Sequence, residues 1–303
     1  MAKTISAALS WARDVLREAK VDSPHLDAEL LLAHVLDWHR PQLYTHADQV
    51  LQLRERTRFA ELIERRAKRE PLAYLVGHRG FYGLDFFVDE RVLIPRPETE
   101  VLVKRAIAEG SRLLELKNHL AIADIGTGCG AIAITLALHL SSAEVYAIDL
   151  STSALEVAEH NCHRHGAEVQ VHLLQGDLLA SLSRQVDMIV ANLPYVAQVE
   201  VSALPLEVSR YEPRRAWDGG VEGLEVIERL LAQAGDYLND EGSIFLEIGA
   251  TQGPAVQRMA AHYFPTSVVE VLPDGADRDR VVEATRRRCS VAGRLHRPVV
   301  AGR

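Results

Sequence analysis

The spacing of apolar positions is helical over the first 70 residues of the chain. In ISAALSWARDVLREA, apolar side chains from Ile5 to Leu16 recur with the period of a helix. A second helix is predicted over SPHLDAELLLAHVLDW, with Ser23 as N-cap and Pro24 at the first helical position. A third, charged helix is predicted over LQLRERTRFAELIERRAKRE. Residues 1–75 are therefore expected to form a small helical domain.

The next stretch, residues 76–117, has the pattern of a hairpin followed by a linker helix. The segment LDFFVDERVLI is expected to form the β-hairpin. In IPRPETE two prolines stiffen a turn, after which Glu98 and Glu100 begin a helix.

From residue 118 to 285 the pattern alternates between strands and helices. The predicted strands are LAIADIG, EVYAID, VQVHLLQGD, VDMIVAN and GSIFLEIG, and the helices between them are GAIAITLALHL, SALEVAEHNCHRHG and GLEVIERLLAQAGDYL. Such alternation predicts a doubly wound α/β sheet. TSVVEVLPD and RDRVVEAT are expected to close it as an antiparallel pair at one edge. Residues 286–303 are expected to form a basic tail outside the sheet domain.

Composition narrows the class of protein. Hydrophobic residues make up 48% and charged residues 25% of the 303, as in ordinary globular proteins. No apolar run approaches the ~18 residues of a membrane span, and the N-terminus has no leader pattern, so a cytoplasmic protein is expected. Three cysteines and the CHRH segment at 162–165 form neither a disulfide framework nor a zinc pattern, so no metal is predicted.

The charge is unevenly distributed. The net charge is −8, yet the last 20 residues hold six arginines and no acid. An acidic body is poorly matched to a nucleic-acid backbone and better matched to a basic protein partner, so no direct nucleic-acid binding is expected. The tail is interpreted as a solubilising, disordered extension, with nucleic-acid contact as the alternative.

Candidate binding residues lie where three predicted strands end. The loop after the first strand places Gly126, Gly128 and Gly130 in a GxGxG spacing, which differs from the GxGxxG of dinucleotide-binding proteins. Asp149 ends the second strand, where an acid can bind both hydroxyls of a ribose, unless it only caps the following helix. Asp177 follows the third strand, where a side chain can meet an adenine. Together these positions favour a bound nucleoside.

The segments DIGTGCG and NLPY, with Asp149 between them, resemble the class I S-adenosylmethionine-dependent methyltransferases. The resemblance implies their seven-stranded sheet, with S-adenosylmethionine as cofactor. By this resemblance Asp149 holds the ribose, and Asp177 with Leu178 flanks the adenine. The methionine part would be wrapped by the residues Gly126, Thr127, Gly128, Cys129 and Gly130. Asp124, before the glycines, is expected to order the loop or to reach an amino group of the ligand.

The NLPY tetrapeptide, Asn192 to Tyr195, follows the fourth strand and resembles the motif of methyltransferases that act on planar nitrogen. The lone pair of such a nitrogen is delocalised, so the nitrogen is a poor nucleophile. The Asn192 side-chain oxygen and the Leu193 carbonyl can accept its two N–H groups and orient the lone pair. Pro194 stiffens the loop, and the Tyr195 ring can pack on a flat amide or base. The glutamine families usually have proline where this chain has Leu193, which leaves the loop's rigidity in question.

Further segments resemble the bacterial release-factor glutamine-N5 methyltransferases, the PrmC/HemK family. They are DAELLLAHVL, PLAYLVGHRGFYGLDFFV, LIPRPETE, RYEPRRAWDGGVEGLEVIERLL and PDGADRDRVV, which span most of residues 5–284. The resemblance implies methylation of the Gly-Gly-Gln glutamine of class I peptide-chain release factors by a monomer. It also implies that the helical domain and hairpin grip that partner. Arg96 and Glu100 are expected to line the cleft between the domains, unless they only form a charged linker.

Other functions remain open on the sequence. One is the sister family that methylates a glutamine of a large-subunit ribosomal protein. A second is a DNA methyltransferase, although no basic target-recognition insertion is visible. A third is a non-catalytic S-adenosylmethionine-binding protein, and a dehydrogenase is more remote.

Overall fold

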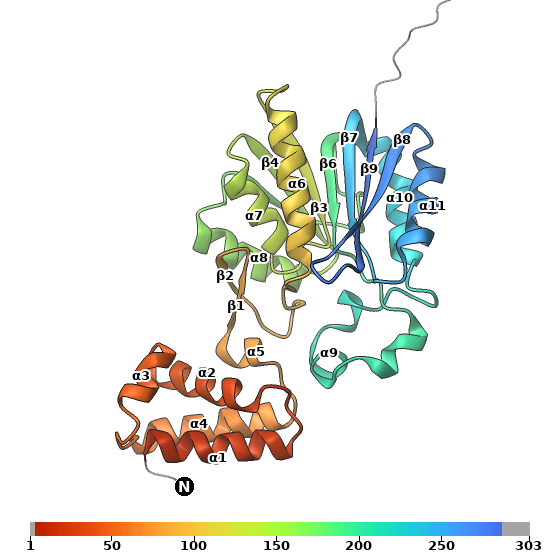
Figure 1. The fold of residues 1–303 in the computed structure, drawn as a ribbon. Coiled ribbons are helices and arrows are strands. Elements are labelled where there is room, and N and C mark those ends of the chain that lie inside the picture. The colour runs from red at the N-terminus through yellow and green to blue at the C-terminus, as the bar shows by residue number, and fades with distance from the viewer. Residues whose placement is uncertain (1–3, 287–303) are drawn as a thin grey trace, which may run out of the picture.

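The structure is a computed structural model that describes residues 4–286. Its N-terminal part is a helical bundle, drawn in red and orange in Figure 1. The elements are α1 (Ile5–Glu18), α2 (Pro24–Leu36), α3 (Arg40–Thr45), α4 (Leu53–Ala67) and α5 (Leu72–Val76). The three predicted helices are present as α1, α2 and α4, and their apolar faces form one buried cluster. The sequence missed α3 and α5, which are too short to show a helical period.

The start of α2 differs in detail from the prediction. The helix begins at Pro24, but the Ser23 side chain makes no capping hydrogen bond. Thr4 does cap α1, where its hydroxyl accepts a bond from the Ala7 backbone N–H at 3.4 Å.

The hairpin lies further toward the N-terminus than predicted. It pairs β1 (His78–Phe81) with β2 (Leu84–Phe87), and residues 88–94 form no strand. The turn residues Tyr82 and Gly83 have φ of 50° and 78°. Positive φ at both central positions is typical of the two-residue turn whose twist matches a hairpin, and Gly83 permits it. The prediction of a hairpin within LDFFVDERVLI was therefore wrong in its placement.

The predicted doubly wound sheet of seven strands is confirmed. Its order is β5-β4-β3-β6-β7-β9-β8. The strands are β3 (Leu120–Ile125), β4 (Ala143–Asp149), β5 (Val171–Gln175), β6 (Val186–Ala191), β7 (Leu238–Glu247), β8 (Ser267–Pro273) and β9 (Asp279–Arg286). β9 inserts between β7 and β8 and runs antiparallel to both, so the expected antiparallel pair does form the edge. Arg286, placed in the tail by the sequence, is the last residue of β9.

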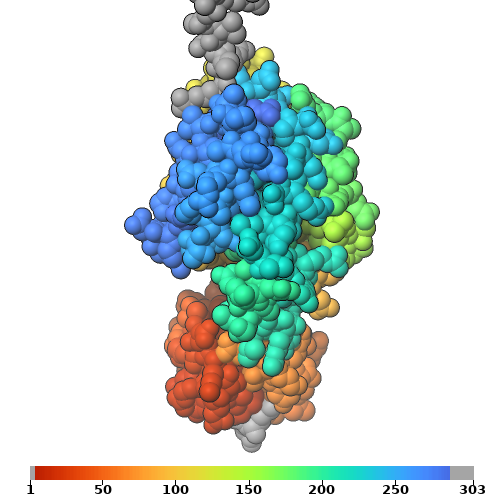
Figure 2. All heavy atoms as spheres, turned by 90° about the vertical axis from the view of Figure 1, so that its right-hand side faces the viewer, coloured from red at the N-terminus to blue at the C-terminus, as the bar shows by residue number. Residues whose placement is uncertain are grey.

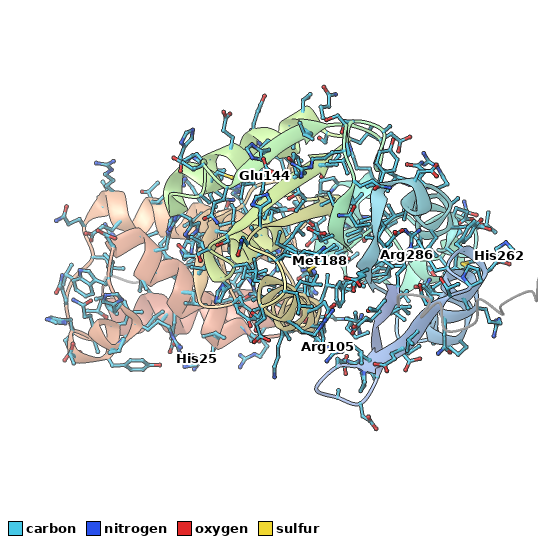
Figure 3. All side chains as sticks on the ribbon, turned by 90° about the horizontal axis from the view of Figure 1, so that it is seen from above. His25, Arg105, Glu144, Met188, His262 and Arg286 are labelled. Atoms are coloured by element: carbon cyan, nitrogen blue, oxygen red, sulfur yellow. The ribbon has the colours of Figure 1, made fainter. Side chains whose placement is uncertain are left out.

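Helices cover both faces of the sheet (Figure 1). One face packs on α6 (Thr99–Leu114), α7 (Ala131–His139) and α8 (Thr152–His165), and the other on α10 (Glu225–Tyr237) and α11 (Gly253–Tyr263). The sequence missed α11. The central strands β3 and β6 are buried throughout, and Met188 of β6, labelled in Figure 3, lies at the middle of the sheet. The strand order reverses between β3 and β6, and ligands of such sheets bind at the carboxyl ends beside that point.

An irregular segment after β6 joins the two parts of the molecule. It contains η1 (Gln198–Ala203), α9 (Leu206–Tyr211) and η2 (Arg214–Ala216). Figure 2 shows this segment, in green and teal, lying against the red and orange helical bundle. The Tyr211 hydroxyl donates to the Lys68 carbonyl at 2.9 Å, which fixes α9 on the end of α4.

Across residues 4–286, none of the helices is both long and apolar enough to cross a membrane.

Candidate active site

A cavity of about 310 Å³ opens at the carboxyl ends of β3, β4, β5 and β6. That volume is at the lower end of the range of small-molecule sites, about 300–1,000 Å³. The structure brings many of the sequence-predicted residues to its wall: Gly126, Gly128, Asp149, Asp177, Leu178, Asn192, Leu193 and Pro194. The site therefore gathers the glycine loop, two strand-end acids and the NLPY segment around one space.

The glycine loop brings bare backbone to the cavity. Gly126 has φ +75°, and a Cβ built on it would lie 3.3 Å from the Leu193 side chain. Asp149 stabilises the same loop, because its carboxylate accepts from Gly128 N–H at 2.9 Å and from Ser151 N–H at 2.8 Å. A carboxylate has about four acceptor positions, so Asp149 retains capacity for hydroxyl groups of a ligand.

Asp124 lies beneath this loop and is fully buried. Its Oδ2 accepts from the Thr127 hydroxyl at 2.6 Å and from Ala133 N–H at 3.2 Å, so it orders the loop. Its Oδ1 is buried with no hydrogen-bond partner among residues 4–286. Burial raises the pKa of Asp124 to about 7, and the two hydrogen bonds oppose that rise. An unsatisfied acceptor under a ligand loop suits a ligand that carries an amino group.

Three other loop residues predicted to wrap the cofactor lie outside the cavity wall. Thr127 is buried, and its hydroxyl is bound to Asp124. The Cys129 side chain is buried, and burial raises its pKa to about 12. Gly130 is the N-cap of α7, and a Cβ there would press on Ala158 at 3.3 Å. These three residues therefore support the glycine loop on the side that faces away from the cavity.

The adenine side of the predicted site carries an ion pair. Asp177 is half-exposed and pairs with Arg229 of α10 at 2.6 Å. Leu178 is buried and has φ +55°, which is rare for a residue with a branched side chain. Backbone strain of this kind is found most often at ligand sites, where the surrounding structure holds it.

Asn192 has one side of its amide engaged and the other free. Its Nδ2 donates to the Thr99 hydroxyl oxygen, at the first residue of α6, over 3.2 Å. In the described part of the chain, no group donates to the Asn192 Oδ1 or to the Leu193 carbonyl. Both acceptors belong to residues of the cavity wall. This pair of acceptors matches the two N–H groups of a primary amide.

Tyr195 is turned away from the cavity toward the end of β7. Its hydroxyl donates to Glu247 Oε1 at 3.3 Å, and burial raises its pKa. Its carbonyl accepts from Gln252 Nε2 at 2.9 Å. A Cβ at Gly219 would lie 2.8 Å from Tyr195 Cα, and one at Gly223 would lie 2.3 Å from its carbonyl oxygen. The NLPY loop is thus held by close backbone packing as well as by Pro194.

Arg96 and Glu100 make contacts that hold elements together. Arg96 Nη2 donates to both carboxyl oxygens of Glu212, at 2.6 and 2.7 Å. This pair ties the segment before α6 to the end of α9. Glu100 Oε1 accepts from the Tyr82 N–H at 2.9 Å and fixes the hairpin on α6. Neither residue lines the cavity.

Several residues at the site were missed by the sequence analysis. Glu247 is buried behind Tyr195, Thr99 is bound to Asn192, and Arg91 and Arg215 line the cavity. An acid inside the apolar run GSIFLEIG, at the carboxyl end of a central strand, is a signal that could have identified Glu247. The two arginines lie in loops whose course no local pattern specifies.

No group of three metal-binding side chains comes together among residues 4–286.

Comparison with known proteins places both parts of the chain. Residues 7–77 match the model of the PrmC N-terminal domain, and residues 97–206 match that of the methyltransferase small domain. The release factor glutamine methyltransferase of Moorella thermoacetica is 43% identical over 94% of this chain and 99% of its own length. That of Rhodopirellula baltica is 38% identical over 92% of this chain and 95% of its own.

A solved structure of the release-factor-specific protein-(glutamine-N5) methyltransferase from Alicyclobacillus acidocaldarius is 28% identical, with a TM-score of 0.42 over 64% of this chain and 94% of that one. The assignment rests on the full-length sequence relatives and on the matching domain models. By these similarities the chain belongs to the release factor glutamine methyltransferase family.

Proposed function

We propose that this protein transfers a methyl group from S-adenosylmethionine to the side-chain amide nitrogen (N5) of the glutamine in the Gly-Gly-Gln motif of class I peptide-chain release factors. The observation that carries the proposal is the pair of free acceptors, Asn192 Oδ1 and the Leu193 carbonyl, beside the glycine loop. The family relationship supplies the substrate class.

The residues around the cavity fit this cofactor. Asp149 and Asp177 offer carboxylates for ribose hydroxyls and the adenine edge, and Asp124 has a buried oxygen without a partner. The bare backbone at Gly126 and Gly128 leaves room for close approach, while Arg215 of the cavity wall can meet a carboxylate. When bound, S-adenosylmethionine supplies a methyl carbon attached to a positively charged sulfur.

The protein's part in the reaction is to orient the nitrogen. Asn192 and Leu193 accept its two N–H groups, so its lone pair can leave the amide plane and point at the methyl carbon. With the cofactor bound, the two oxygen acceptors would stabilise the positive charge that develops on the nitrogen as it takes the methyl group from sulfur. The methylated nitrogen is acidic and loses one proton to solvent, so no strong base is required.

The helical bundle and the hairpin are proposed to bind the release factor. The match of residues 7–77 to the PrmC N-terminal domain supports this part of the proposal. It favours a release factor over a ribosomal protein as the substrate.

The test uses purified protein, labelled S-adenosylmethionine and a release factor of the same organism. Mass spectrometry should find one methyl group on the Gly-Gly-Gln glutamine. The modification should be lost with Asn192→Ala and with a factor whose glutamine is replaced. Cofactor binding without transfer to this factor would reject the assignment, and ribosomal protein and DNA would be tested in parallel.

A further inference from the structure

The carboxyl group of Glu247 is buried behind the NLPY loop, at the end of β7. It is 1% exposed and does not line the cavity. Its Oε1 accepts from the Tyr195 hydroxyl at 3.3 Å, and the Thr99 hydroxyl is its second hydrogen-bonding neighbour. No donor in the described chain forms a hydrogen bond with Oε2. A buried acid that faces Tyr195 of the acceptor loop and Thr99 of α6, but not the cavity, can act only through them.

The Thr99 hydroxyl faces both the Asn192 amide and the Glu247 carboxyl group. Asn192 Nδ2 donates to the Thr99 oxygen, so the single Thr99 proton is free to point at Glu247. An ionised carboxylate only accepts, and it therefore keeps Thr99 as a donor toward itself and as an acceptor toward Asn192. An asparagine amide has nearly the same shape in its two orientations, so the surrounding network decides which end faces the ligand.

We propose that Glu247 is a positioning residue that fixes the orientation of the Asn192 amide through Thr99, so that Asn192 Oδ1 faces the incoming nitrogen. This inference rests on the proposed function, because the free oxygen has a role only if an N–H donor is the substrate. Under this proposal, Glu247 decides whether Asn192 presents its oxygen, an acceptor, or its NH2 group, a donor, to the reacting nitrogen.

Protonation of Glu247 would reverse this arrangement. A protonated carboxyl can donate to the Thr99 oxygen and compete with Asn192 for it. The charged and titratable groups that face Glu247 are Arg280 of β9, Tyr195 of the loop and Glu98 before α6. Burial raises the pKa of Glu247 to about 6, while Thr99, Arg280 and Tyr195 oppose that rise. The carboxyl is thus ionised at neutral pH, and the Asn192 orientation should weaken in mild acid.

The test compares Glu247→Gln, which can donate permanently, with Asp187→Asn as a matched control. Asp187 is also a buried acid of the sheet, at the opposite end of β6, where it accepts from Ala121 N–H at 3.0 Å. We expect Glu247→Gln to lower kcat about 10- to 100-fold, as expected for a loss of transition-state positioning, with cofactor affinity within about threefold. Asp187→Asn should lower stability without changing kcat at a temperature where it is folded.

A second pair of variants isolates the relay. Thr99→Val removes the hydroxyl and should reproduce the loss, whereas Thr99→Ser should restore activity. In wild type kcat should fall below about pH 6, and Glu247→Gln should lack this acid limb. Equal kcat for Glu247→Gln and wild type, or equal activity of the Val and Ser variants, would overturn the proposal.

Nuclear magnetic resonance of the Asn192 side-chain amide separates this inference from the proposed function. Its protection from hydrogen exchange, measured against the intrinsic rate at each pH, should be greater above pH 6 than below in wild type, and small at both in Glu247→Gln, whatever the substrate. Transfer failure with this exchange pattern would reject the substrate alone. Methylation of the release factor without this exchange pattern would reject the role of Glu247 alone.

Discussion

Arg66 of α4 and Glu207 of α9 form an ion pair at 3.0 Å, although 141 positions separate them in the chain. Arg66 also holds Asp27 of α2 at 2.7 Å, and Arg69 donates to Glu207 at 2.8 Å. Although burial acts to raise it, the bonds from Arg69 and Arg66 hold the pKa of Glu207 below its ordinary value. The helical bundle is therefore tied to the sheet domain through α9 as well as through the linker.

Replacing Glu207 by Gln should loosen this connection. Loss of a hydrogen-bonded charge is expected to cost about 1.5–3 kcal/mol of unfolding free energy. In addition, KM for the release factor should rise while kcat changes little, because the acceptor loop is untouched. Denaturant unfolding and steady-state kinetics measure the two effects. Glu61→Gln is the control, since Glu61 is 56% exposed and its contact with Arg58 is 3.6 Å. An equal loss in both variants would contradict a special role for α9.

Gly126→Ala should damage the cofactor site more than the fold. Its φ is +75°, and the added Cβ would lie 3.3 Å from Leu193. Gly166→Ala provides the control, because Gly166 has φ +66° with nothing within 4 Å of a Cβ. Both variants should lose about 1–2 kcal/mol from left-handed strain. Only Gly126→Ala should also weaken S-adenosylmethionine binding by about tenfold or more, or about 1.4 kcal/mol. Calorimetric titration would show this, and unchanged affinity would refute it.

Asp149→Asn should weaken cofactor binding without unfolding the domain. The amide would set a donor against Gly128 N–H or Ser151 N–H, where two acceptor oxygens now lie. A lost bond to a charged group corresponds to roughly 10- to 100-fold in affinity. Asp177→Asn should cost only a few-fold, since Asp177 is half-exposed and already paired with Arg229. The two dissociation constants, measured side by side, check the order.

Asp124→Asn should change how stability depends on pH. In the folded protein burial raises the Asp124 pKa to about 7, above its unfolded value, so folding favours the protonated form. The stability contributed by that proton is complete in acid and is lost as pH rises through 7. The neutral variant lacks this loss. Its melting temperature relative to wild type should increase between pH 5 and pH 8, and a constant difference would argue against a protonated Asp124.

Removing the residues after Arg286 should have little effect, whereas replacing Arg286 itself should destabilise the fold. Arg286 Nη2 donates to the Gly235 carbonyl at 3.0 Å, and the guanidinium lies 5.2 Å from the Phe264 ring centre. A chain that ends at Arg286 should therefore keep its melting temperature and its methylation activity. Arg286→Ala should lose about 1–2 kcal/mol. A large loss of activity in the truncated chain would show that residues 287–303, which lie outside the described residues, are not a passive extension.

The sequence predicted the sheet domain well because its strands are long apolar runs between strong helix patterns. The strand ends at Gly126, Asp149 and Asn192 follow from the same pattern, since parallel strands finish at one edge. The short helices α3, α5 and α9 could not be predicted, because five or six residues show too little periodicity. The hairpin was misplaced because Val88, Val92 and Ile94 alternate like a strand, yet they are buried loop residues.

The contacts of individual site residues were harder to predict from the sequence. Arg96 and Glu100 have binding partners 116 and 18 positions away, and no local pattern encodes such distances. Glu247 could be identified as a site residue only once β7 was known to lie beside β6.

The Leu193 side chain lies so close to Gly126 that an added Cβ would be 3.3 Å from it, so two proposed binding sites share one wall. The residue whose carbonyl is proposed to accept the glutamine N–H lies against the loop proposed to hold S-adenosylmethionine. Any ordering of that wall by one ligand must appear, by thermodynamic reciprocity, as an equal gain in the affinity for the other. The side chain at position 193 would then tune the cooperativity between cofactor and protein substrate, apart from the chemical step itself.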